Sequence, residues 1–377
     1  MSKWPGKYVI GLTGNIATGK SVVRRMLEHL GAYGIDADAL SHRAVAKGAP
    51  GYQPVLGAFG KWILDDKEEI DRTKLGRLVF SDPDALKQLE VIVHPLVEHA
   101  VDLMVQRASQ RVIVIEAIKL LEGNLAAACD TIWVTDAPEN VQLTRLQNKR
   151  QLSEPEALQR IRSQPAQGKK VAAASTVIHN TGSFEDTWIQ VVAAWKLISP
   201  SSDTGPIVLH KAAKGELAVQ RGRPRDSANI AALINRLSGG TRQPTADEIM
   251  AAFGEKAFLL LTADNSPVGL AGWQVENLVA RTTDLYIDSV IPLEQAIKTL
   301  ITEVERASQD LQCEASLLFL LPQQATQEAV WKELGYSRRT PQTLGVQAWR
   351  DAALESQPPN TILLFKQLRQ DRVLRPI

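Results

Sequence analysis

The stretch that decides the fold of this chain is Gly14-Asn15-Ile16-Ala17-Thr18-Gly19-Lys20-Ser21. It fits GxxxxGK[ST], the pattern of a phosphate-binding loop, or P-loop. The apolar run at residues 8–12 predicts a buried strand before it, and residues 22–30 are compatible with a helix after it. In that setting the backbone N–H groups of the loop form a nest for phosphates, which the glycines allow to approach closely. The order therefore predicts nucleotide binding, against the alternative of an ordinary glycine-containing turn.

Two side chains of the loop carry the expected chemistry. Lys20 would reach the β- and γ-phosphates of a nucleoside triphosphate, and the hydroxyl of Ser21 would ligate Mg²⁺. The remaining loop residues would surround the phosphates with backbone N–H groups. The motif leaves the acceptor of the phosphate undecided.

Composition sets the limits of the protein class. A chain of 377 residues is too long for one ordinary core, so we expect two domains. The net charge of +1 argues against nucleic-acid or membrane-surface binding through bulk charge. Residues 1–7 contain no apolar core of a signal peptide, and no apolar run approaches the length needed to span a membrane. Cys129 and Cys313 show no metal-ligand spacing and suit a reducing compartment. We expect a cytoplasmic protein without nucleic-acid or membrane partners, and its oligomeric state stays open.

The first 199 residues alternate strands and helices. Continuous apolar runs predict parallel strands buried on both faces at residues 8–13, 32–35, 111–116, 131–135 and 176–178. Residues 81–84 and 153–156 both predict helix starts, each with a serine cap, a proline in the first turn and an acid at the third position. Repeated strand–helix alternation predicts an α/β domain with a doubly wound parallel sheet.

Residues 200–206 predict a linker by their serine, proline and glycine content, which divides the chain into domains at 1–199 and 207–377. The second domain has a different rhythm. Strands are expected at residues 218–222, 257–262, 268–275, 283–288, 316–321 and 362–366, and helices from about 226 and at 245–253, 293–310 and 326–334. Residues 264–267 predict a hairpin turn. This order predicts an α+β domain with mixed strand pairing.

Two aspartates follow the second predicted strand. Asp36 and Asp38 come at its carboxyl end, the edge at which ligands bind in open α/β sheets. A carboxylate there could accept the proton of an attacking hydroxyl or bind Mg²⁺ through water. The residues after Asp38 also look helical, so Asp38 could instead be an N-cap. The spacing leaves base and cap equally open.

Several short motifs, in the same order and at the same spacing, resemble the dephospho-CoA kinase family over residues 7–198. They are Gly11-Leu12-Thr13-Gly14, Ile35-Asp36-Ala37-Asp38, Gly48-Ala49-Pro50, Phe80-Ser81-Asp82-Pro83, His94-Pro95-Leu96 and Ile178-His179-Asn180-Thr181-Gly182. The resemblance implies a P-loop kinase-type sheet with a helical lid. It also implies transfer of the γ-phosphate of ATP to the ribose 3′-hydroxyl of dephospho-CoA.

The resemblance also assigns residue roles. Asp38 is the implied base, and Lys20, Mg²⁺ and lid arginines would neutralise phosphate charge. Arg145 and Arg150 lie where the family carries its lid arginines, although they also suit a solvated helix face. Asn180 would contact the adenine of ATP, with a turn residue as its alternative.

Two further residues are considered at the same site. Glu116 ends the third strand and is a candidate for contact with Mg²⁺-bound water or substrate. His94 could be a ligand or an acid–base group in contact with the substrate, but the Pro95 that follows it favours a break between two helices, where its ring would pack.

The chain departs from the family pattern at several places. The family usually has Pro-Leu-Leu after the third-strand acid, where this chain reads Ile118-Lys119-Leu120-Leu121, and His42 stands where arginine is usual. Asn15, Ala17, Ser175 and His179 are smaller departures. The changes at Ile118-Lys119 and His42 bear on the acceptor pocket. The alternatives are a P-loop kinase for another small hydroxyl acceptor and a non-catalytic nucleotide- or CoA-binding protein.

From about residue 207 the chain resembles GNAT-type N-acetyltransferases in its order of elements and in the segment Trp331-Lys332-Glu333-Leu334-Gly335-Tyr336. The family binds the pyrophosphate of acetyl-CoA with a glycine-rich loop before its long helix. Residues 291–298 contain no glycine at that place, so backbone N–H groups there are not expected to cradle a pyrophosphate. We expect a degenerate, accessory domain, with an active acetyltransferase as the alternative.

Overall fold

The computed structural model describes residues 3–199, 208–210, 217–371 and 374. The chain divides into two compact units, each described here by itself. The first comprises Met1–Lys20, Ala32–Val177 and Asp371–Ile377, and the second comprises Ser21–Gly31 and Ile178–Gln370. The expected linker at 200–206 lies outside the described residues. The sequence-based division at 199 and 207 therefore stays a prediction.

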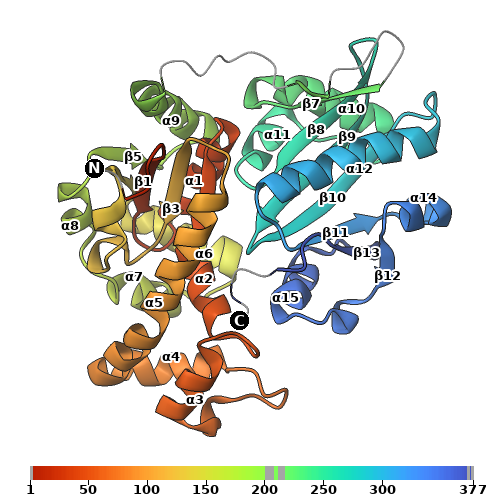
Figure 1. Cartoon of the computed structure of the whole chain (residues 1–377). Coiled ribbons are helices and arrows are strands. Elements are labelled where there is room, and N and C mark those ends of the chain that lie inside the picture. Colours follow the sequence, from red (N-terminus) through yellow and green to blue (C-terminus); the bar gives the residue numbers. More distant parts are fainter. Residues whose placement is uncertain (1–2, 200–207, 211–216, 372–373, 375–377) are drawn as a thin grey trace. The chain divides into compact units, whose positions relative to one another are not determined.

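The first sheet has five strands in the order β2-β3-β1-β4-β5 (Figure 1). Its strands are β1 (Tyr8–Thr13), β2 (Tyr33–Asp36), β3 (Val112–Glu116), β4 (Thr131–Asp136) and β5 (Thr176–His179). β1 pairs in parallel with β3 and with β4, and β2 pairs in parallel with β3. All five expected strands are confirmed to within two residues at either end. The central β1 and β3 are almost wholly buried, because continuous apolar runs suit strands covered on both faces.

Helices connect these strands, and α1 begins at the last residues of the P-loop. They are α1 (Lys20–His29), α2 (Ala37–Ala44), α3 (Tyr52–Phe59), α4 (Arg72–Ser81), α5 (Pro83–Arg107), α6 (Glu139–Arg150), α7 (Glu154–Arg162), α8 (Gln167–Ala172) and α9 (Phe184–Ile198). The predicted start of α7 is confirmed, with the Glu156 carboxylate accepting from the Ser153 N–H at 3.0 Å. No helix within the described ranges has the length and apolarity needed to span a bilayer.

Two expectations about α5 are wrong. Its N-cap is Asp82, whose carboxylate accepts from the N–H groups of Asp84 and Ala85, and Ser81 is the last residue of α4. The helix also continues without a break through His94 and Pro95, and it is 25 residues long in all. An internal proline costs about 3 kcal/mol. Burial of the α5 face that contains Val93, Val97, Ala100, Val101 and Met104 offsets that cost, and His94 is exposed.

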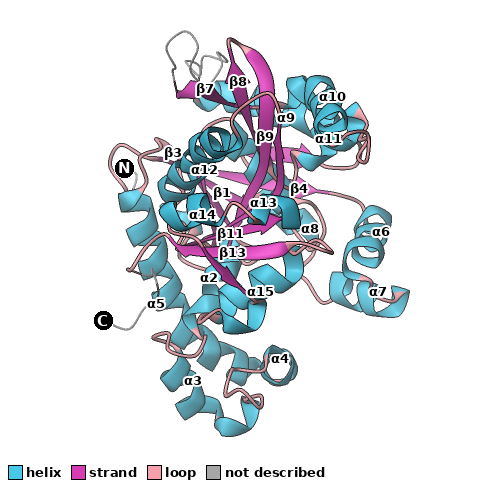
Figure 2. Cartoon of the chain, turned by 90° about the vertical axis from the view of Figure 1, so that its right-hand side faces the viewer, coloured by secondary structure: helices cyan, strands magenta, loops and turns pink. Residues whose placement is uncertain are grey.

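The second unit holds an eight-stranded mixed sheet in the order β12-β13-β11-β10-β9-β8-β7-β6. Figure 2 shows its strands in magenta, with β7, β8, β9, β11 and β13 labelled. Its strands are β6 (Val208–His210), β7 (Leu217–Arg221), β8 (Ala257–Ala263), β9 (Ser266–Glu276), β10 (Val279–Ile287), β11 (Ala315–Leu320), β12 (Ser337–Arg339) and β13 (Ile362–Gln367). Only β10 and β11 pair in parallel among the described pairs. The expected hairpin between β8 and β9 is confirmed, with Asp264 and Asn265 at φ angles of 47° and 65°.

Helices cover both faces of this sheet, in agreement with the expected element order. They are α10 (Ser227–Leu237), α11 (Ala246–Ala252), α12 (Leu293–Asp310), α13 (Pro322–Ala325), α14 (Glu328–Glu333) and α15 (Gln347–Ser356). On β8, Leu259 and Leu261 pack in the same cluster as α12, whereas Phe258 and Leu260 pack with α10 and α11. The alternation follows from the two-residue period of a strand. β6, β12, α13 and α15 were not predicted, and β10 begins four residues earlier than expected.

Helix α1 belongs to the second unit from Ser21 onward. The ring of His29 lies 2.7 Å from the carbonyl oxygen of Phe253, and Arg25 donates to the carbonyl of Glu255 at 2.6 Å. Burial, together with the nearby guanidinium of Arg221, lowers the pKa of His29 to about 3. His29 is therefore neutral, and its ring donates to the Phe253 carbonyl.

Candidate active site

The P-loop takes a conformation that requires its glycines. Gly14 and Gly19 have φ angles of 149° and 96°. A Cβ atom on Gly14 would lie 2.4 Å from the Thr135 hydroxyl of β4, so no larger residue fits there. The Thr18 hydroxyl lies 2.7 Å from that same hydroxyl and donates to the Asn15 carbonyl at 2.8 Å. The end of β4 therefore fixes the shape of the loop.

Ala17 also takes a left-handed conformation, with φ at 59°. A residue with a Cβ atom pays about 1–2 kcal/mol for this conformation. The guanidinium of Arg145 on α6 donates to the Ala17 carbonyl at 3.1 Å and helps to hold it. The expected lid arginine thus contacts the loop.

Lys20 is buried at the start of α1, and Ser21 follows it in the first turn of that helix. The Lys20 Nζ donates to the Asn15 carbonyl in a long hydrogen bond of 3.4 Å. Burial lowers the pKa of Lys20, while the nearby carboxylates of Glu116 and Asp38 oppose that shift. The ammonium therefore lies among acidic groups at the edge of the sheet, in a position to receive phosphate oxygens.

The structure separates the roles of the two aspartates. Asp36 is the N-cap of α2, and its Oδ1 accepts from the Ala39 N–H at 2.8 Å. Asp38 lies inside the first turn of α2, so the alternative that made it the cap is wrong. Its Oδ2 accepts from the Ile118 N–H at 3.0 Å, across to the segment that follows β3. The Asp38 carboxylate is thus available for chemistry.

The surroundings of Asp38 favour a proton acceptor. Burial raises the pKa of its carboxyl group, and the charge of Glu116 adds to this effect. The Ile118 N–H and the Lys20 ammonium act in the opposite direction. Glu116, the last residue of β3, is 3% exposed. A base with a raised pKa binds a proton more strongly than an ordinary aspartate.

Sequence reasoning missed Lys170 on α8. This side chain is 2% exposed, and its Nζ donates to the Ile118 carbonyl at 2.7 Å. The backbone of Ile118 therefore contacts both side chains, because its N–H donates to Asp38 and its carbonyl accepts from Lys170. Burial lowers the pKa of Lys170, which the acidic charges of Glu122 and Asp38 oppose. In the sequence, Lys170 is marked only as one of two adjacent lysines in a short segment. Its role could not be predicted, because the Ile118 carbonyl that it contacts lies 52 residues away in the chain.

Two glutamines close over the start of the P-loop and were not predicted. The Gln164 side-chain oxygen accepts from the Ile16 N–H at 2.7 Å, and the Gln167 oxygen accepts from the Asn15 N–H at 3.0 Å. The Asn15 amide donates to the Pro165 carbonyl at 3.0 Å. Residues 164–166, between α7 and α8, and Gln167, the first residue of α8, hold the first half of the loop.

The remaining candidates lie as follows. Arg150 is the exposed last residue of α6, and its charge lowers the pKa of Lys20. Asn180 is buried in the second unit, where its side-chain oxygen accepts from the Thr187 hydroxyl at 3.1 Å. His42 is exposed on α2, and Lys119 is an exposed partner of Glu90. Their roles with nucleotide or acceptor stay predictions.

The donors at this edge fit Mg²⁺, which prefers oxygen ligands and keeps several waters beside substrate phosphates. The Ser21 hydroxyl follows Lys20 directly, and Glu116 and Asp38 both act on the Lys20 charge. The described residues contain no group of three or more His, Cys, Asp or Glu side chains arranged to hold a metal. A magnesium ion bound mainly by phosphates does not need such a group.

Comparisons with known proteins agree with this geometry. A family model described as dephospho-CoA kinase matches residues 8–186. The dephospho-CoA kinase of Geobacter metallireducens is 42% identical over 191 residues, covering 50% of this chain and 95% of the relative. That of Carboxydothermus hydrogenoformans is 40% identical over 194 residues, covering 50% and 94%.

Solved structures resemble each half of the chain. The crystal structure of TT1252 from Thermus thermophilus covers 51% of this chain and 97% of its own, with 31% identity and a TM-score of 0.47. PaiA N-acetyltransferase from Thermoplasma acidophilum, in complex with coenzyme A, covers 40% and 99%, with 11% identity and a TM-score of 0.31.

Proposed function

The chain belongs to the dephospho-CoA kinase family, and we propose that its N-terminal half transfers the γ-phosphate of ATP to the ribose 3′-hydroxyl of dephospho-CoA, giving CoA. One observation of this structure supports the proposal in addition to family membership. Asp38 is freed from capping by Asp36 and reaches the same edge of the sheet as Lys20. A base and a phosphate-binding cation therefore meet where the two substrates must meet.

In this proposal the P-loop binds the phosphates of ATP. The N–H groups of its second half, which include those of Gly19 and Lys20, surround the phosphate oxygens. Lys20 neutralises the β- and γ-phosphates, and Arg145 and Arg150 approach from the lid. Asn180 would contact the adenine. Positioning and charge neutralisation supply most of the catalysis in phosphoryl transfer.

Asp38 accepts the proton of the acceptor hydroxyl as that oxygen attacks the γ-phosphorus. The Ile118 N–H fixes one carboxylate oxygen, Oδ2, and leaves Oδ1 without a hydrogen-bond partner among the described residues. Oδ1 is therefore the atom that we assign to proton acceptance. The raised pKa of Asp38 suits the task, because a stronger base draws the proton more effectively.

Magnesium would be held by the Ser21 hydroxyl and by phosphate oxygens, with Glu116 reaching it through water. The ion would neutralise charge that develops on the β- and γ-phosphates. Lys170 acts as a positioning residue, because it holds the carbonyl of Ile118, the residue whose N–H orients Asp38. The departure at Ile118 leaves this arrangement intact, since only its backbone is used.

The test is ATP-dependent formation of CoA from dephospho-CoA with Mg²⁺, using wild type, Asp38→Asn and Asp36→Asn. We expect product from wild type and a large loss of kcat in Asp38→Asn. Asp36→Asn is the matched control, because asparagine also caps helices. Comparable losses in the two variants would refute the assignment of Asp38. Absence of product from a wild type that still binds ATP would refute the reaction and favour another acceptor or a binding protein.

For the second domain we propose an accessory role without acetyl transfer. The segment before α12 has no glycine, and Pro292, which has no N–H, is the N-cap residue of that helix. Titration with acetyl-CoA and with CoA tests this role. Acetyl transfer from acetyl-CoA to an amine would refute it.

We also propose a cytoplasmic location. Within the described residues neither Cys129 nor Cys313 forms a disulfide, which suits a reducing compartment. Detection of the chain in a cytoplasmic fraction tests this proposal, and recovery with membranes or outside the cell would refute it.

A further inference from the structure

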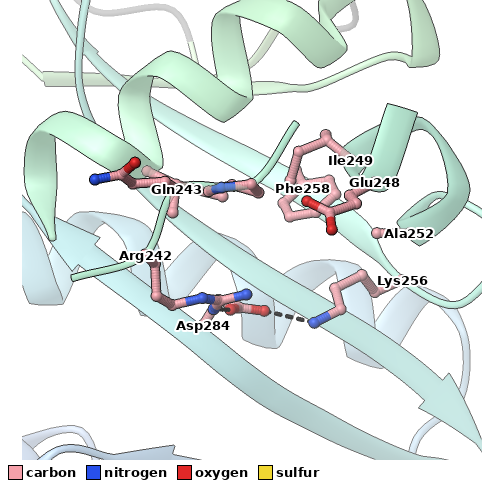
Figure 3. A pocket seen from close by; sticks show the side chains of 10 residues that line it. Arg242, Gln243, Glu248, Ile249, Ala252, Lys256, Phe258 and Asp284 are labelled. Atoms are coloured by element: carbon pink, nitrogen blue, oxygen red, sulfur yellow. Dashed lines mark hydrogen bonds and ion pairs between the residues drawn. The ribbon is translucent and has the colours of Figure 1, made fainter. Parts of the chain in front are cut away.

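The second unit contains a pocket of about 470 Å³ beside α10 and α11 (Figure 3). Its volume lies in the range of small-molecule sites. Figure 3 shows Arg242 and Lys256 converging on Asp284 along one side. Ile249 and Phe258 form an apolar wall. Phosphoryl transfer makes no use of this pocket.

The local structure of β10 places Asp284 in the pocket. The pairing of β10 with β9 shifts register between Thr282 and Asp284, and Asp284 then lies opposite Gly272. A Cβ atom on Gly272 would lie 2.5 Å from Asp284 Oδ2. The missing side chain thus makes room for the carboxylate, which is 5% exposed.

The charges around Asp284 leave a net positive group. Its Oδ1 accepts from Arg242 Nη1 at 2.5 Å and its Oδ2 accepts from Lys256 Nζ at 2.6 Å. Burial alone would raise the pKa of Asp284, but Lys256 and Arg242 together hold it below its ordinary value. The carboxylate is therefore ionised at neutral pH. Two cations then face one anion, so the three side chains carry a net charge of about +1.

The guanidinium of Arg242 keeps N–H donors that its hydrogen bonds within the described residues do not use. Its Nη1 binds Asp284 and the Tyr286 hydroxyl, the latter at 2.9 Å. Its Nε and Nη2 make no hydrogen bond within the part of the chain that is described. The side chain is about half exposed. A guanidinium edge of this kind suits a carboxylate or a phosphate.

The rest of the pocket selects between those two anions. Glu248 also lines it and is fixed in place, with Oε2 accepting from the Thr245 N–H at 2.8 Å. A second acidic charge disfavours a dianion such as phosphate more than a monoanion. Ile249 and Phe258 are almost fully buried in their own cluster and offer apolar surface to the pocket. An apolar chain gains free energy there by leaving water.

We propose that this pocket binds a small monocarboxylate with an apolar chain. The carboxylate lies on the outer edge of Arg242, and the chain lies against Ile249 and Phe258. All the residues that line this pocket belong to the second unit, and none of them is a residue that we assign to phosphoryl transfer.

The experiment is calorimetric titration of the full chain with phenylacetate as the probe, beside acetate and inorganic phosphate. We expect saturable binding of phenylacetate, binding of acetate that is at least about tenfold weaker, and no binding of phosphate. Arg242→Gln should weaken phenylacetate binding by at least about tenfold. Arg236→Gln is the matched control, because Arg236 pairs with Asp288 and does not line the pocket.

Three results would overturn the proposal: no saturable binding of phenylacetate, tighter binding of phosphate, or unchanged binding by Arg242→Gln. If Arg242→Gln does not fold, Ala252→Phe replaces it. This change fills the pocket from α11 and leaves the three charged side chains intact. Retained phenylacetate binding in a folded Ala252→Phe protein would equally count against the site.

Discussion

Replacement of Asp38 by asparagine separates catalysis from stability. Asparagine has the same shape, and its side-chain oxygen can still accept from the Ile118 N–H at the 3.0 Å position of Oδ2. The variant therefore keeps the local contact and loses only the ability to take a proton. A general base contributes about 10²–10⁴-fold to a rate, which corresponds to about 2.7–5.4 kcal/mol of barrier. We expect a loss near the lower end, because Lys20 and Lys170 remain in place.

The same substitution should not destabilise the protein. Burial raises the pKa of folded Asp38, so the folded state binds this proton more strongly than the unfolded state. The ionised side chain therefore lowers stability as pH rises from the ordinary aspartate pKa through the raised one. Asp38→Asn removes that penalty at neutral pH, and its advantage should vanish at pH below the ordinary pKa. Unchanged or higher Tm with reduced kcat marks a functional site rather than a structural one.

Initial rates of CoA formation, nucleotide affinity and thermal unfolding at neutral and acid pH measure these effects together. We expect ATP affinity to change little, because Asp38 does not belong to the P-loop. A variant with kcat within a few-fold of wild type would refute proton acceptance by Asp38. A large fall in Tm at neutral pH would refute the argument that its burial is unfavourable.

Further predictions follow from other residues. Lys170→Met should lower kcat more than it changes KM, and it should raise the pKa of the acid limb in the pH profile of kcat, because a cation beside Asp38 is lost. Lys170→Arg should return that pKa to its wild-type value. An unchanged pKa of the acid limb in Lys170→Met would contradict the positioning role. Gly14→Ala should cost about 1–3 kcal/mol of stability and abolish ATP binding, because the new Cβ atom would clash with Thr135. In the control Gly57→Ala, the new Cβ atom on α3 meets no neighbouring atom, so Tm should rise. Burial raises the pKa of Cys129 to about 12, so its thiol should resist alkylation at pH 8, and rapid labelling of the folded protein would contradict this.

Local sequence predicted most of the first sheet correctly, and the reason is physical. A parallel strand buried on both faces needs a continuous apolar run, which is visible without knowledge of its neighbours. The P-loop is similarly local, because strand, glycines and helix are consecutive in the chain. The proline in α5 shows the limit of such reasoning. Its local cost predicted a break, but burial of a long apolar face kept the helix continuous.

In the second unit the sequence predicted the order of most elements and the hairpin between β8 and β9. It placed the start of β10 too late and missed α15. It also gave no sign of the pocket around Asp284, which depends on a register shift against β9 and on the absence of a side chain at Gly272. These features arise between strands, and strand pairing is not encoded in either strand alone.

The sequence by itself determined the P-loop between its strand and helix, the parallel strands of the first domain and a short list of acidic residues as candidates for the base. The family resemblance implied Asp38 as the base, but only the tertiary structure showed that Asp36 caps α2 through the Ala39 N–H and that Asp38 is not the cap. It also brought Lys170 to the Ile118 carbonyl from 52 residues away. Side chains that act together at one sheet edge come from separate crossovers, so their proximity is a property of the packed chain and not of any segment within it.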